Sequence, residues 1–506
     1  MRDAVTPLLT LVAPPETAAA LEAALHREPR LTELVQVLAQ VPAAPTGPVL
    51  TVGAAGIASA VDWSESLPPL VLPRPLPFTA DNLLALVFLH LGNWEKAYEY
   101  AAAHPALHHD FDRLNRLQAG VAVEVPAAPL NDEGSFEHYR YWHNRAVVLH
   151  YGQLTQPADA ADLQNGYQQA IAHAPAADWQ AFSAKHYATF LLDNGQLDEA
   201  RQLLADTLNL PLDAAAHHEL QAVETGVLLQ QLTVPYDAAL LAELRDKLWQ
   251  TLTYYEQQQR PLQAALTLLD AAQVANFSDS FAEALGYLNR ATTQLSRADA
   301  PELLANAQYR KGVLLFTWAQ SGNPQFYRGA MTAYQQALQV FTRNDAYPVF
   351  AEIQHHLGII YSEIPDEVKK KSIWAAVSVS SFNQALEYFT RDAHPYEYAT
   401  ISNHYANALT KFPLAARSDN FAKALGFYRE ALAVRTARAY PYERALTLLN
   451  FLEAAWQVNL ENDPNPEALL TEMTAYAEEI PLLVEDGALR EAAQQHLARL
   501  ETVLLA

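Results

Sequence analysis

The sequence predicts an all-α fold, an α-solenoid of stacked antiparallel helix pairs, from two regularities. One is an internal repeat, because the ten residues from Ser278 to Tyr287 return in similar form from Ser418 to Phe427. This offset of 140 residues corresponds to three units of about 47 residues. The other is a proline on the same period, at Pro301, Pro348, Pro395 and Pro441. A single helix pair cannot bury its apolar faces alone, so such units are expected to stack on their neighbours.

Composition allows a large folded chain and excludes several kinds of chemistry. Half of the 506 residues are hydrophobic, which is enough for an extensive core. Cysteine is absent, so disulfides, thiolate metal sites and cysteine nucleophiles are excluded. The net charge of −24 argues against general affinity for nucleic acid or for an anionic membrane. No targeting segment and no apolar run of about 18 residues stands out, so we expect a cytoplasmic protein.

Residues 1–78 are expected to form N-terminal helices followed by a proline-rich strap or linker. Thr17–His26 and Arg30–Gln40 have the helical spacing of Leu, Val and Ala. Prolines and glycines crowd the stretch 41–77, which therefore cannot sustain a helix. Within it Val49–Val52 has the composition of a short strand, and the rest is expected to be extended chain that links domains or lies across the first helices.

Residues 79–260 are expected to form irregular helical repeats. Helical patterning begins at Thr79, which suits a helix N-cap. The turn Gly92–Ala97 combines a glycine that ends one helix with an alanine where the next helix touches it, and the phrase recurs at Asn194–Ala200.

Residues 261–460 are expected to form the regular array. Proline stands where each leading helix of this array begins, a position at which its missing N–H has no helical partner to lose. The remaining residues, 461–506, are expected to form capping helices that cover the last open apolar face.

Aligned units show which positions of the helices touch. In each second helix a small residue is followed four residues later by a large one, and three residues further by alanine. These three columns are Ala284, Ala330, Ser378 and Ala424; then Leu288, Tyr334, Phe382 and Tyr428; then Ala291, Ala337, Ala385 and Ala431. The first helices place Gly312, Gly358 and Ala406 at the facing position. Helices approach closely where side chains are small, and a large side chain must fill the space beside the contact.

These residues carry a resemblance to the tetratricopeptide repeat family. Leu357–Tyr361 reads L-G-x-x-Y, and Ala330–Tyr334 and Ala424–Tyr428 read A-x-x-x-Y. The period is longer than the ~34 residues usual in that family, and Gln354 stands at its Trp position. HEAT and armadillo arrays share the longer period, but the small–large–small columns favour tetratricopeptide packing. Long repeats of this type look like those that accompany bacterial signalling proteins, some with caspase-like domains, and no such domain is present here.

The resemblance implies a right-handed superhelix whose first helices line a concave groove. Counted from the small position of each first helix, the inward residues are Asn306, Tyr309, Glu352, His355, Asn403, Asn407, Lys411, Asn450 and Glu453. Asparagine offers both a donor and an acceptor and can therefore hold a peptide backbone. A solvated row that binds no ligand is the alternative.

Two further features bear on the choice of ligand. Basic residues outnumber acidic ones between Lys411 and Arg444, a local pattern that suits an acidic segment or a C-terminal carboxylate. Glu352 and His355 have the spacing of a di-iron ligand pair, but no second copy is found, so neither a metal nor another cofactor is expected. Glycine-rich nucleotide-binding phrases and hydrolase signatures are also missing.

We therefore expect a non-catalytic scaffold that holds a peptide or helix of a partner protein in the concave groove, with no nucleic-acid or membrane partner. One alternative is a regulatory sensor, in which a peptide or small ligand in the groove changes the superhelix and so controls a separate effector. The least favoured interpretation is an enzyme with a site between the irregular N-terminal half and the array.

Overall fold

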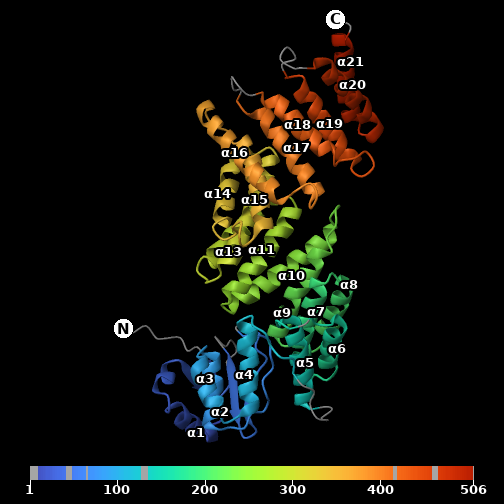
Figure 1. Ribbon diagram of the computed structural model, residues 1–506. Coiled ribbons are helices and arrows are strands. Elements are labelled where there is room, and N and C mark those ends of the chain that lie inside the picture. The colour runs from blue at the N-terminus through green and yellow to red at the C-terminus, as the bar shows by residue number, and fades with distance from the viewer. Residues whose placement is uncertain are drawn as a thin grey trace. The chain divides into compact units, whose positions relative to one another are not determined.

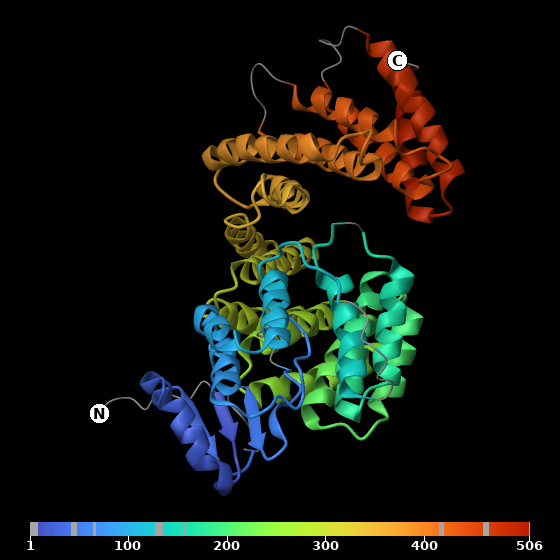
Figure 2. The same ribbon diagram turned by 60° about the horizontal axis from the view of Figure 1, so that its bottom comes forward.

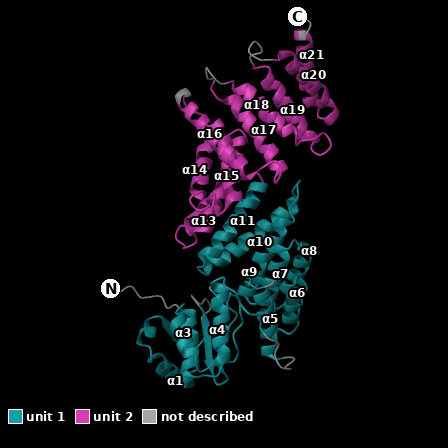
Figure 3. Ribbon diagram, in the orientation of Figure 1, with its two compact units in different colours: residues 1–277 teal, residues 278–506 magenta. Residues whose placement is uncertain are grey.

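The computed structural model describes residues 9–41, 48–63, 67–126, 135–155, 157–413, 419–458 and 465–504 (Figure 1). The chain divides into two compact units, residues 1–277 and 278–506 (Figure 3). Helices in antiparallel pairs dominate both units, which confirms the predicted fold class for the repeats.

Unit 1 begins with a four-stranded sheet. Strand β1 (Leu9–Val12) pairs in parallel with β2 (Val35–Leu38) and with β3 (Val49–Gly53), and β3 pairs antiparallel with β4 (Gly56–Ser59). The strand order is therefore β2-β1-β3-β4. Figure 2 shows strands of this sheet as blue arrows near the N-terminal end of the chain. Helix α1 (Pro15–Leu25) connects β1 to the segment that leads into β2, and forms where the sequence predicts a helix.

The prediction of a helix over Arg30–Gln40 is wrong. A short 3-10 turn at Pro29–Glu33 leads directly into β2, whose Val-Gln-Val-Leu sequence has the β-branched residues that suit a strand. The strand predicted at Val49–Val52 is confirmed as β3. An all-α description thus applies to the helical repeats and not to residues 9–59.

The rest of unit 1 is helical. Its helices are α2 (Ala80–His90), α3 (Trp94–Ala101), α4 (Pro105–Gln118), α5 (Phe136–Tyr151), α6 (Ala160–Ala172), α7 (Ala177–Asp193), α8 (Leu197–Leu208), α9 (Ala214–Gln230), α10 (Ala238–Gln257) and α11 (Pro261–Phe277). Thr79 caps α2 by accepting from the backbone N–H of Asn82, as predicted. Gly92 and Gly195 end their helices with positive φ, the conformation that glycine adopts most easily. Helix α5 contacts α7, α7 contacts α9, and α9 contacts α11.

Unit 2 contains the regular pairs. Its helices are α12 (Phe281–Leu295), α13 (Pro301–Gln320), α14 (Tyr327–Ala337), α15 (Tyr347–Glu363), α16 (Val368–Tyr388), α17 (Pro395–Lys411), α18 (Asn420–Leu432), α19 (Pro441–Ala455), α20 (Pro466–Leu483) and α21 (Gly487–Leu504). The prolines lie in the first turn of α13, α15, α17 and α19, as predicted. Each of these first helices contacts the next, whereas α14, α16 and α18 contact one another weakly at most. Within unit 2 the first helices therefore form the more closely spaced layer, as expected on the inner side of a curved stack.

Close helix contact explains the small and large columns. A Cβ added to Gly312 would lie 2.6 Å from the ring of Tyr334, and one added to Gly358 would lie 3.0 Å from the ring of Phe382. Both aromatic rings are fully buried. The hydroxyl of Ser378 donates to the carbonyl oxygen of Gly358 at 2.6 Å, so this helix reaches the backbone of its partner. The predicted packing is confirmed.

Gly312→Ala is expected to lower the free energy of unfolding by about 1–3 kcal/mol, because the added methyl group would overlap the Tyr334 ring. Gly286→Ala and Gly426→Ala are matched controls in exposed helix, where nothing lies within 4 Å of the added Cβ. They are expected to raise stability by up to about 1 kcal/mol, since alanine loses less backbone entropy in a helix. Urea unfolding followed by circular dichroism measures all three, and an undiminished stability in Gly312→Ala would contradict the packing argument.

Candidate functional site

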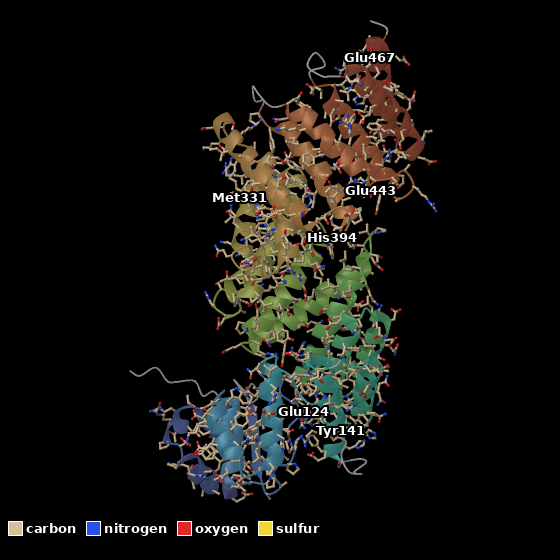
Figure 4. The ribbon with its side chains drawn as sticks, in the orientation of Figure 1. Glu124, Tyr141, Met331, His394, Glu443 and Glu467 are labelled. Carbon is tan, nitrogen blue, oxygen red and sulfur yellow. The ribbon has the colours of Figure 1, made fainter. Side chains whose placement is uncertain are left out.

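The nine predicted inward residues lie on the four first helices of unit 2, and we call them the polar row. They are Asn306 and Tyr309 on α13, Glu352 and His355 on α15, Asn403, Asn407 and Lys411 on α17, and Asn450 and Glu453 on α19. Figure 4 shows the side chains of these helices and labels Glu443 in the first turn of α19. Since each first helix contacts the next, the row is continuous across them.

Side chains of the polar row bond across the contacts between first helices. The hydroxyl of Tyr309 on α13 donates to Glu352 Oε1 on α15 at 2.6 Å. His355 Nε2 on α15 lies 2.9 Å from His404 Nδ1 on α17, and the two rings are stacked. His404 was not predicted. It directly follows Asn403, and adjacent helical positions point about 100° apart, so the sequence pattern assigned only one of the two to the inner face.

The same bonding continues toward α19. Asn450 Nδ2 donates to Asn403 Oδ1 at 3.4 Å. The ammonium group of Lys411 forms an ion pair with Glu363 at the end of α15. A polar pair therefore joins every successive first helix from α13 to α19.

Two members of the polar row bond within their own helix pair or helix. Asn407 Oδ1 accepts from the hydroxyl of Tyr428 at 2.6 Å, so its side chain supports the contact between α17 and α18. Asn306 Oδ1 accepts from Arg310 Nε at 3.1 Å. Glu453 is exposed. The role of all nine residues in binding remains a prediction.

Burial keeps the histidine pair neutral. It lowers the pKa of His404 to about 4, with a further contribution from the positive charge of Arg435. Burial also lowers the pKa of His355 well below its ordinary value. Between two neutral imidazoles one ring nitrogen donates and the other accepts, which the observed pair satisfies. In Tyr309, burial and the bond to Glu352 raise the pKa of the phenol.

Acidic side chains of the same unit neutralise much of the predicted basic region. Arg429 pairs with Glu472 at 2.6 Å, and Arg444 pairs with Glu479 at 2.6 Å. Both carboxylates come from α20, so an external acidic segment would have to displace them. Arg417, which also belongs to this region, lies outside the described residues.

Arg435 is a buried cation beside the polar row. It is 6% exposed and donates to Thr447 Oγ1 at 2.8 Å and to Thr400 Oγ1 at 3.1 Å. Burial lowers the pKa of its guanidinium group. The two threonines lie on α19 and α17, so Arg435 ties these first helices together.

Neither a cluster of metal ligands nor a membrane-spanning helix is found among the described residues. Glu352 and His355 are bonded to different helices, and no group of three or more His, Asp or Glu there could hold a metal ion. None of the helices described is long and apolar enough to cross a membrane.

Unit 1 contains a cavity that sequence reasoning did not predict. Its volume is about 960 Å³, and its lining includes Trp63, Lys185, His186 and Arg260. Beside it, Lys185 Nζ and Arg260 Nη1 each lie 2.6 Å from a carboxylate oxygen of Glu219, which joins α7, α9 and the start of α11. The two cations share one carboxylate, an arrangement that holds these helices together.

No family model matches the sequence, and no curated protein matches it. The solved structures with similarity include human IFIT1, a dimer with m7Gppp-AAAA, at 12% identity over 84% of this chain and 82% of that one, with a TM-score of 0.37. The TPR domain of P58(IPK) is 16% identical over 83% of this chain and 97% of its own, with a TM-score of 0.21. Yeast Tom70 is 11% identical over 84% and 95%, with a TM-score of 0.22. With TM-scores this low, these similarities do not define the fold, which follows from the helix pairs themselves.

Acidification is expected to destabilise unit 2 through its neutral histidines. Below the ordinary histidine pKa of 6.5 the unfolded chain binds protons that folded His404 does not, so the free energy of unfolding falls as the pH is lowered toward about 4. Each such histidine contributes about 1.4 kcal/mol per pH unit within this window. Urea unfolding across a pH series measures the slope, which His404→Gln should make shallower. The control Gln336→Ala, which replaces an exposed side chain without a titratable group on α14, should leave the slope unchanged, and equal slopes for both variants would contradict the assignment.

Proposed function

We propose that unit 2 is a non-catalytic scaffold that binds an extended peptide segment of a partner protein along the polar row. The observation that supports it is the continuity of the row, which crosses four first helices and is bonded at each step. Side chains already held by such bonds lose little conformational entropy when a ligand arrives, which favours binding.

The chemistry of the polar row favours an extended peptide over a helix. An extended segment has backbone N–H and C=O groups that need partners, and the half-buried Asn450 has an amide oxygen and a second amide hydrogen beside its bond to Asn403. A helix has satisfied most of its own backbone and binds through apolar anchors instead. The row is composed mainly of amide, imidazole and charged side chains, so it matches the first kind of ligand better.

Peptides selected on the purified full chain from a random display library test this proposal. The row variant combines Lys411→Ala, Asn450→Ala and Glu453→Ala, because these side chains contribute less to the contacts within helix pairs than Asn407 does. Its Kd for the selected peptides is expected to rise about tenfold or more, which corresponds to about 1.4 kcal/mol of lost binding free energy.

The matched control combines Gln336→Ala, Asn383→Ala and Lys423→Ala, which are exposed on the second helices α14, α16 and α18. It should leave the Kd unchanged in the same fluorescence-polarisation assay. Selected peptides that bind the row variant and the control equally well would rule out the polar row as the binding surface.

A further inference from the structure

Unit 1 carries an extended segment of its own chain across its first helices. We call Val61–Trp63 and Leu67–Leu72 the strap; residues 64–66 lie outside the described residues. The strap belongs to the connection between β4 and α2, and this connection is closed at its base. There the N–H of Ile57 donates to Leu76 O at 2.7 Å, and the N–H of Leu76 donates to Ile57 O at 2.9 Å. The base of the connection is therefore held to the sheet by bonds that are separate from the contacts between the strap and the helices.

Side chains of helix α5 form hydrogen bonds with the backbone of the strap. Asn144 Oδ1 accepts from the N–H of Val71 at 2.7 Å, and Asn144 Nδ2 donates to the carbonyl oxygen of the same residue at 2.8 Å. Two residues earlier in the strap, the carbonyl oxygen of Pro69 accepts from Nε2 of the adjacent His143 at 2.8 Å. These bonds use only backbone groups of the strap, so any extended chain could make them. Figure 4 labels Tyr141 on the same helix.

A second contact fixes the other end of the strap. Arg260 Nη2, directly before α11, donates to the carbonyl oxygen of Trp63 at 2.7 Å. The Trp63 ring meets Phe182 of α7 edge-to-face with a centroid separation of 5.4 Å. Trp63 and Val71 are buried, at 8% and 4% exposure. Trp63 thus contacts α7 and the start of α11, and Val71 contacts α5.

The strap leaves a cavity between itself and the helices that it covers. The cavity of about 960 Å³ lies between the strap and α7, since both contribute to its lining. His186 on α7 is 6% exposed and lines this cavity, and its Nε2 has no hydrogen-bond partner among the described residues. Protein interiors are normally close-packed, and their buried polar groups are hydrogen-bonded. The strap therefore leaves part of the surface beneath it unpacked and the Nε2 atom of His186 without a hydrogen bond.

We propose that the surface of α5 and α7 that contacts the strap is a second peptide-binding surface, which the strap occupies as a built-in competitor. Its external ligand is an extended, proline-containing apolar segment of another protein. Asn144 and His143 supply the backbone contacts, and the sites of Val71 and Trp63 accept apolar side chains. Proline presets the extended conformation, as Pro68 and Pro69 do in the strap. A ligand that also fills the cavity and offers His186 a partner would compete successfully. The proposal uses none of the polar row.

A variant with Leu67–Leu72 replaced by a Gly-Ser sequence of equal length tests this competition. The probe is a labelled synthetic peptide with the sequence of Leu67–Arg74, measured by fluorescence polarisation on the full chain. The open variant is expected to bind the probe with one-to-one stoichiometry and at least about tenfold more tightly than the native chain, whose own strap competes. The polar-row variant Lys411→Ala, Asn450→Ala and Glu453→Ala should not change this affinity, which separates the two proposals.

A matched probe isolates the asparagine contact. N-methylation of the amide that corresponds to Val71 keeps every side chain but removes the N–H that Asn144 accepts. This probe should bind the open variant about tenfold more weakly than the unmodified one. Asn144→Ala in the open variant should remove the difference between the two probes.

Should the open variant fail to fold, Val71→Gly keeps the strap and removes its buried side chain, so it weakens the competitor and leaves the helices unchanged. It is expected to bind the unmodified probe more tightly than the native chain does. A folded open variant or Val71→Gly chain that gains no affinity for the probe would overturn the proposal and leave the strap a purely structural segment.

Discussion

Close contact between the two helices of each pair is the constraint on which the rest of unit 2 depends. Gly312 lies directly against Tyr334, and Gly358 against Phe382, so neither helix can rotate without losing this contact. The fixed rotation determines which side of each first helix faces its own partner. The remaining sides then meet the neighbouring first helices, and this is where the polar row lies.

Polar groups between the helices are bonded to one another and so specify one arrangement. His355 and His404 are neutral and satisfy each other, and Arg435 reaches threonines on two helices. In unit 1, Glu219 joins Lys185 to Arg260. Buried ion pairs of this kind add little net stability, because desolvation offsets most of the attraction. Removal of one partner nevertheless destabilises the fold strongly, since it leaves the other charge buried and unpaired. They therefore favour one alignment of the helices over its alternatives.

Both proposed binding surfaces contain asparagine side chains on first helices. The sequence suggested that asparagines on the first helices of unit 2 could hold a peptide backbone, because an amide both donates and accepts. The structure shows this geometry in unit 1, where Asn144 bonds both backbone groups of Val71. The sequence pattern does not point to α5, because this helix belongs to the irregular repeats. The same amide chemistry is therefore present in unit 1, whereas peptide binding by the asparagines of unit 2 stays a prediction.

The sequence by itself determined the repeat period, the helix starts at Pro301, Pro395 and Pro441, and the small and large columns. These features are local or periodic, so their spacing along the chain is enough to place them. Only the tertiary structure decided that β1 pairs with both β2 and β3, that His404 is the partner of His355, and that α20 supplies carboxylates to the basic region. Periodicity tells which side of an element is buried, whereas the identity of the residue opposite depends on how distant segments pack.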